Sequence, residues 1–164
     1  MDDSSALSER WTEYERLREG GAAYSAIVRI SEIANYLAHH KGGSRDLIEH
    51  WTTRLRGLEV PKDTLMMAID QSYVALDRLR RMLSFGTDFQ YEELVAALTS
   101  RVELELFAGF LRRLGTNIDL DFQLIDEELL SVAKTRGNTA AFREAQAAIR
   151  RNWGLPIRAA WLEP

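Results

Sequence analysis

The chain of 164 residues contains no cysteine. This absence excludes disulfide bonds, zinc sites built from thiolates and catalysis by a cysteine nucleophile. The first residues, MDDSSALSERW, are acidic and polar, and they carry neither the basic region nor the apolar stretch of a secretory signal peptide. Both observations favour a protein of the reducing cytoplasm, and we expect a cytoplasmic localisation.

Long apolar runs are also missing from the sequence. A membrane-spanning helix needs about 20 consecutive apolar residues, and the most apolar region, 102–114, is interrupted by two acidic and two basic residues. There is no excess of positive charge either, because 21 Lys and Arg residues stand against 25 Asp and Glu residues, a net charge of −4. We therefore expect no membrane association, and nucleic acid is not the favoured partner.

Apolar residues recur at helical spacing almost everywhere along the chain. The pattern predicts an all-α fold of about seven helices, near residues 7–17, 23–37, 45–58, 61–83, 87–110, 117–132 and 138–153. The predicted connections are short, so helices that follow one another in sequence should be antiparallel. Because no stretch resembles an interdomain linker, we predict that residues 1–164 form a single-domain antiparallel helical bundle.

Basic residues followed by glycine mark the end of every predicted helix. Cations near a helix C-terminus offset its partial negative charge, and glycine adopts the left-handed conformation that ends a helix. The glycines expected to do this are Gly20, Gly42, Gly57, Gly86, Gly115, Gly137 and Gly154.

The segment NIDLDFQL, residues 117–124, fits two structures. It alternates polar and apolar residues as a strand does, yet Ile118, Phe122 and Ile125 also belong to a helical stripe that continues downstream. A single strand would need a partner, and no second strand pattern lies nearby. We favour a helix for this segment, with a start that lies between Asn117 and Asp121.

All three histidines fall in the window HHKGGSRDLIEHWT, residues 39–52. His39 and His40 are adjacent, so on a helix they point about 100° apart and cannot easily share one metal ion. The Glu-x-x-His and His-Glu-x-x-His spacings of helical metal sites are absent. We predict no metal and no cofactor, and we interpret the window mainly as a corner between two helices, with Ser44 as the N-cap of the second.

One spacing inside this window points to catalysis. Arg45 and His50 are separated by four residues, which resembles the arginine–histidine motif of HEPN-type ribonucleases. In those helical proteins the motif lies late in the chain, and residues from two protomers cleave RNA without metal. The resemblance implies His50 as the proton-transfer group and Arg45 as the phosphate-stabilising group. It makes a metal-independent ribonuclease the alternative function.

Carboxylates elsewhere have simpler interpretations. Glu105 lies four residues after Arg101, the spacing of an intrahelical ion pair. Asp126, Glu127 and Glu128 are interpreted as a solvated acidic face.

Pairs of arginines at the predicted helix ends are candidate anion-binding residues. If the ends converge, they form a face for a nucleic-acid backbone, which gives a second alternative function, a nucleic-acid-binding helical subunit. The candidates are Arg80, Arg81, Arg112, Arg113, Arg150 and Arg151.

The C-terminal tail, residues 154–164, is too apolar to be stable as a free segment in water, so we expect it to dock on the bundle or on a partner. The candidate partner-binding residues here are Trp153, Ile157, Trp161 and Leu162. With no nucleophile constellation or phosphate loop, the favoured function is a non-enzymatic interaction or regulatory module. Such a module would self-associate or act as a small subunit of a larger assembly, with a protein partner or a second copy of the chain.

Overall fold

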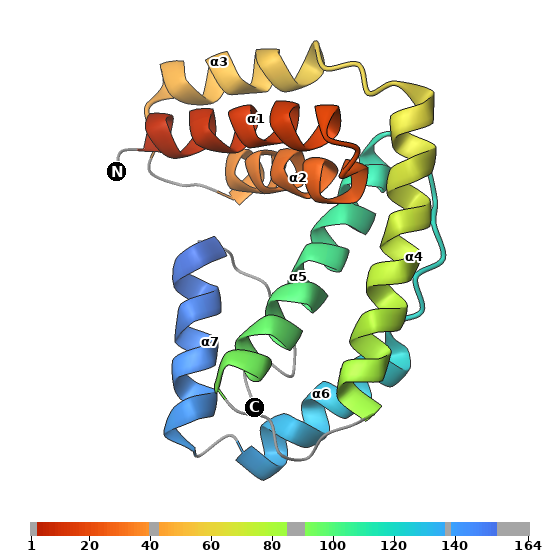
Figure 1. Cartoon of the computed structure of the whole chain (residues 1–164). Coiled ribbons are helices and arrows are strands. Elements are labelled where there is room, and N and C mark those ends of the chain that lie inside the picture. Colours follow the sequence, from red (N-terminus) through yellow and green to blue (C-terminus); the bar gives the residue numbers. More distant parts are fainter. Residues whose placement is uncertain (1–2, 40–42, 85–90, 137–138, 154–164) are drawn as a thin grey trace. The chain divides into compact units, whose positions relative to one another are not determined.

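The computed structural model describes residues 3–39, 43–84, 91–136 and 139–153 (Figure 1). Within these ranges the chain is all-α and contains no strand, as the apolar periodicity predicts. The seven helices are α1 Asp3–Glu19, α2 Ala23–His39, α3 Arg45–Arg56, α4 Lys62–Ser84, α5 Tyr91–Arg113, α6 Gln123–Arg136 and α7 Ala140–Trp153. Their arrangement as one antiparallel bundle stays a prediction.

The chain divides into two compact units. Unit 1 comprises residues 1–72 and 106–118, and unit 2 comprises residues 73–105 and 119–164. The chain passes from one unit to the other inside α4, inside α5 and after Ile118. Each of the two longest helices, α4 and α5, therefore contributes residues to both units. The single-domain organisation expected from the sequence stays a prediction.

Unit 1 is built around α2, which is apolar over most of its circumference. Ten of its residues are buried, among them Ile27, Ile30 and Ile33, as expected for a helix that is covered on several sides. Aromatic rings join the other elements: the centroids of Trp11 and Trp51 lie 6.0 Å apart, linking α1 to α3.

The side chain of Gln71 on α4 caps the N-terminal end of α2 within unit 1. The amide of Tyr24 donates a hydrogen bond to Gln71 Oε1 at 2.9 Å, and Gln71 Nε2 donates to the carbonyl of Gly21 at 3.0 Å. The first amides of a helix have no partner inside the helix, so Gln71 of α4 satisfies a donor that would otherwise be unpaired.

Unit 2 has a core of regularly spaced apolar residues from four helices. Their spacing of three or four positions places them on one face of each helix. The core residues are Leu76, Leu79 and Leu83 of α4, Leu94, Leu98 and Val102 of α5, Ile125, Leu129 and Ala133 of α6, and Phe142 and Ala145 of α7.

Two helix ends confirm the left-handed glycine stop, and a third does not. Gly115 has a φ of 80°, and the Thr116 amide bonds to the carbonyl of Leu111 at 3.0 Å, the pattern of a Schellman motif. The first helix ends in the same way at Gly21, one residue beyond the expected Gly20. Gly57 ends α3 in the right-handed conformation, with φ −81°. The stops expected at Gly42, Gly86, Gly137 and Gly154 lie outside the described residues.

The ambiguous segment is neither helix nor strand over most of its length, because α6 begins only at Gln123. The favoured helix is confirmed from Gln123 onward, which is two residues later than the latest expected start at Asp121, and residues 117–122 are not helical. The alternating pattern nevertheless has a physical meaning, since Leu120 is buried while Asp119 and Asp121 are exposed. Asp121 Oδ1 then accepts a hydrogen bond from the Gln123 amide at 3.0 Å, and this contact sets the late start of α6.

Candidate functional site

Arg45 and His50 both lie on α3, and both side chains are exposed. Five residues along a helix correspond to a rotation of about 140°, so the two side chains leave the helix in different directions. The His50 ring packs edge-on against Trp51, with centroids 5.6 Å apart. Ser44, which precedes them, makes no side-chain capping hydrogen bond, so its expected role as a side-chain cap is not found.

The arginine pairs are distributed over both units. Arg80 and Arg81 belong to unit 2, and Arg112 and Arg113 belong to unit 1. All four are exposed, but three make protein contacts. Arg80 Nη2 donates to the Asp121 carbonyl at 3.3 Å, Arg113 Nη1 donates to the Ala34 carbonyl at 3.5 Å, and Arg81 pairs with an acidic neighbour. No single unit contains both pairs.

Other candidates from the sequence fall at the C-terminal end of the chain. Trp153, Arg150 and Arg151 belong to α7, but their side chains lie outside the described residues. Ile157, Trp161 and Leu162 lie outside the described residues as well. The docking of the tail stays a prediction.

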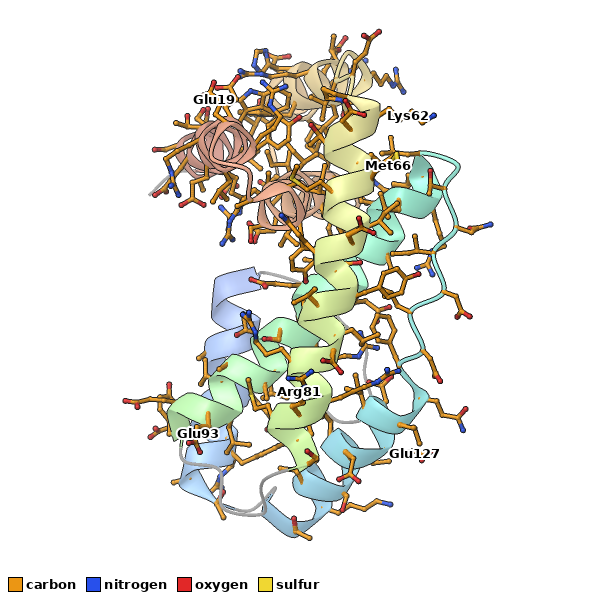
Figure 2. The ribbon with its side chains drawn as sticks, turned by 45° about the vertical axis from the view of Figure 1, so that its right-hand side comes forward. Glu19, Lys62, Met66, Arg81, Glu93 and Glu127 are labelled. Atoms are coloured by element: carbon orange, nitrogen blue, oxygen red, sulfur yellow. The ribbon has the colours of Figure 1, made fainter. Side chains whose placement is uncertain are left out.

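A cluster of exposed apolar side chains lies on α4. Met66, Met67, Tyr73 and Val74 are 55%, 46%, 43% and 60% exposed, and we call these four residues the α4 apolar patch. Met66 and Tyr73 are seven residues apart, as are Met67 and Val74. Because they lie on one continuous helix, this spacing forms two short parallel rows along its surface. Figure 2 shows Met66 and Arg81 on this helix.

The sequence pattern did not identify this patch. By its three-residue spacing from Leu76, Tyr73 would fall on the buried stripe of α4, but its side chain is exposed. Met66 and Met67 flank that stripe, where methionine is usually a core residue, but both side chains are exposed. One signal was present in the sequence: the apolar residues of α4 occupy a wider arc than the row formed by Leu76, Leu79 and Leu83 can bury.

Unit 1 contains a buried carboxylate held by two arginines. Glu32 of α2 is 7% exposed, and its two oxygens lie 2.7 Å from Arg10 Nε and 2.6 Å from Arg29 Nη1. Arg29 Nε also lies 3.0 Å from Glu13 Oε2. Burial raises the pKa of Glu32 above its ordinary value, although Arg29 and Arg10 both act to lower it. The pairs Arg10–Glu32 and Glu13–Arg29 therefore connect α1 to α2.

Unit 2 contains a buried arginine held by two carboxylates. Arg101 of α5 is 5% exposed. Its Nε and Nη2 donate to the two oxygens of Asp126 at 2.7 and 3.0 Å, and its Nη1 lies 2.6 Å from Glu105. The guanidinium also stacks 3.8 Å from the ring centroid of Phe122. Burial acts to lower the pKa of Arg101, but its hydrogen bond to Asp126 and the charge of Glu105 raise the pKa above its ordinary value.

These contacts test two interpretations of the carboxylates. The ion pair expected between Arg101 and Glu105 is confirmed. Glu127 and Glu128 are exposed, as a solvated acidic face requires. Asp126 is only partly exposed and forms a bidentate pair with Arg101, which attaches the start of α6 to α5. Each buried charge is paired with two groups of opposite charge, which makes the two clusters structural connections between helices.

Metal-binding clusters are not found in the part of the chain that the structure describes: no three His, Asp or Glu side chains are grouped to hold an ion. None of the described helices combines the length and apolar character needed to cross a membrane. Comparison with family models, with curated proteins and with solved structures gave no match. The α4 apolar patch is therefore the surface feature that most needs an explanation.

Proposed function

We propose that this protein is a non-enzymatic interaction module that binds another protein through the α4 apolar patch. The supporting observation is the concentration of exposed apolar side chains on one helix. The described residues include seven large hydrophobic side chains that are exposed, and four of them form this patch. Single exposed apolar residues are ordinary on protein surfaces, whereas contiguous ones typically mark interaction sites.

The residue types in the patch suit this role. Methionine has an unbranched, polarisable side chain that adapts to the shape of a partner. Tyrosine is among the residues that contribute most binding energy at protein interfaces. Met66 with Tyr73 and Met67 with Val74 form two exposed apolar rows along α4, and an amphipathic helix of a partner can pack its apolar face on such rows. The module would then serve as a small subunit or regulatory partner in a larger assembly.

The test is a comparison of proteins recovered from the source cells with two double variants. Met66→Ser/Val74→Ser removes apolar surface from the patch. Leu114→Ser/Leu124→Ser removes two exposed leucines from outside α4 and is the matched control. Circular dichroism should show the same helix content in both. The patch variant is expected to recover a binding partner at least about tenfold less than the parent protein, and the control variant to recover it normally. Equal recovery by both variants would contradict the proposed function.

A further inference from the structure

Asp70 occupies the centre of the α4 apolar patch. The four patch residues are its neighbours at positions −4, −3, +3 and +4: Met66, Met67, Tyr73 and Val74. Residues at these spacings lie about 5–6 Å apart on a helix surface. The Asp70 side chain is exposed, and no ion pair or hydrogen bond engages it within the described residues. A single carboxylate is thus surrounded by exposed apolar side chains.

The two other acidic residues on this face of α4 have roles within the protein. Asp63 lies in the first turn of α4, where the positive end of the helix dipole stabilises a carboxylate. Asp77 pairs with Arg81 at 2.6 Å. Asp70 has neither of these roles, and aspartate is a poor helix former in the middle of a helix. Among the described residues, no contact within the protein accounts for an aspartate at this position.

We infer that Asp70 accepts an arginine side chain of the partner protein, an assignment that rests on the proposed function of the patch. A guanidinium offers two parallel donors to a carboxylate, which gives both strength and direction to the contact. The patch residues would exclude water from this pair and so strengthen it. The ring of Tyr73 offers a face on which a guanidinium stacks, and the methionines can cover the apolar stem of the arginine.

A second copy of the chain fits this surface poorly. If two copies of α4 paired antiparallel about the centre of the patch, Asp70 of each would face Asp70 of the other. A parallel pair would oppose Asp63, Asp70 and Asp77 with their own counterparts. Like charges placed directly opposite each other destabilise an interface. The charge of the patch therefore favours a basic partner over self-association.

The experiment uses four synthetic helical peptides of about 18 residues, the length of a typical recognition helix. They are identical except for the central residue, which is Arg, Lys, Gln or Glu, and leucines flank it at three and four positions on each side. Each peptide is titrated into the full chain, and the NMR shifts of the α4 amides report binding. The Arg peptide is expected to bind at least about tenfold more tightly than the Gln peptide and the Glu peptide most weakly.

Two substitutions make the assignment specific to one residue. Asp70→Asn should reduce the preference for the Arg peptide over the Gln peptide to within about twofold, whereas Asp63→Asn should leave the preference unchanged. Met66→Ser/Val74→Ser should weaken all four peptides together. If all four peptides bind α4 equally, the arginine assignment is wrong while the patch remains a binding surface. Absence of α4 shifts with every peptide, or dimerisation of the free protein through α4, also overturns the assignment. The proposed function is judged separately, by the recovery experiment above.

Discussion

The two units hold their helices together with charge clusters of opposite sign. In unit 1 the buried group is an acid, Glu32, between Arg10 and Arg29. In unit 2 the buried group is a base, Arg101, between Asp126 and Glu105. Each cluster has one charge inside and two partly exposed partners around it, and each joins two helices. The clusters differ in how burial affects the ionisation of the central group.

Burial does not remove the charge of an arginine under ordinary conditions, because its pKa is already far above neutral. The partners of Arg101 raise that pKa further, so the cluster in unit 2 stays ionised. For Glu32 burial outweighs both arginines and raises the pKa toward neutral pH. The ionised form of Glu32 is therefore held less favourably than the ionised form of Arg101. We therefore expect loss of the Arg101 cluster to lower the stability of the protein more than loss of the charge of Glu32.

The largest effect is expected from Arg101→Met. Methionine keeps the apolar stem but removes the bidentate pair with Asp126, the pair with Glu105 and the stacking on Phe122. Both carboxylates left behind are partly exposed, so water hydrates them again. We expect the free energy of unfolding to fall by about 2 kcal/mol, measured by urea denaturation. Faster amide hydrogen exchange in the first turns of α6 should accompany this loss.

The control for this variant is Arg81→Met. Arg81 pairs with Asp77 at the same four-residue spacing that separates Arg101 from Glu105, but both members of that pair are well exposed. An exposed pair of this kind contributes at most about 0.5 kcal/mol. A loss as large as that of Arg101→Met would show that burial and the contact with Asp126 are not what distinguishes Arg101.

A smaller effect is expected from Glu32→Gln at neutral pH. The amide has nearly the same shape as the carboxylate and carries no charge to be desolvated. Glutamine can still accept a hydrogen bond from Arg10 or Arg29. We expect the free energy of unfolding to change by less than about 1 kcal/mol. If Glu32→Gln destabilises the protein as much as Arg101→Met, the contrast between the two clusters is wrong.

The pH dependence of stability separates the clusters in a second way. With a raised pKa, folded Glu32 binds a proton at a pH where the unfolded chain, with its ordinary value near 4.5, does not. Stability therefore rises as the pH falls through the raised pKa and stops rising below about 4.5. Glu32→Gln should lack this rise, while Arg101→Met should retain it. Urea denaturation of the parent protein and of both variants between about pH 4 and pH 8 measures this contribution of Glu32 to the free energy of unfolding. Identical pH profiles for the three proteins would contradict the raised pKa of Glu32.

The smallest effect on stability is expected from removing a tyrosine hydroxyl. Tyr14 of α1 is buried, and its hydroxyl has no hydrogen-bond partner among the described residues. Tyr36 of α2 instead donates to Asp3 Oδ2 at 2.7 Å. Tyr14→Phe is expected to leave stability unchanged or to raise it by about 0.5 kcal/mol, whereas Tyr36→Phe should lower it by about 0.5 kcal/mol. Thermal denaturation measures both, and a marked loss for Tyr14→Phe would reveal a contact that the hydroxyl makes.

The number of helices and several of their ends could be predicted from local sequence. Apolar spacing identifies the helices because one turn is enough to define a face. The left-handed stop at Gly115 follows from a local backbone requirement, and the Arg101–Glu105 pair follows from helix spacing. The segment before α6 could not be predicted, because an alternating pattern is also compatible with an extended segment that buries Leu120.

Contacts between distant segments could not be predicted in this way. The partner of Arg101 on α6 is 25 residues away, and nothing in the local pattern selects Asp126 over its two acidic neighbours. The α4 apolar patch depends on the same kind of information. Periodicity shows that α4 has more apolar surface than one stripe requires, but only the packing of the other helices decides which residues stay exposed.

The most direct test of the interaction surface is photo-cross-linking in the source cells from two positions with nearly equal exposure. A benzoylphenylalanine replaces Val74 in the patch, which is 60% exposed, or Leu124 on α6, which is 62% exposed. Since the exposure of the two positions is matched and the same probe is introduced at both, the comparison reports mainly on location. We predict a discrete covalent adduct with another protein from position 74 and none from position 124. Adducts from both positions, or from neither, would contradict the α4 apolar patch as the binding surface.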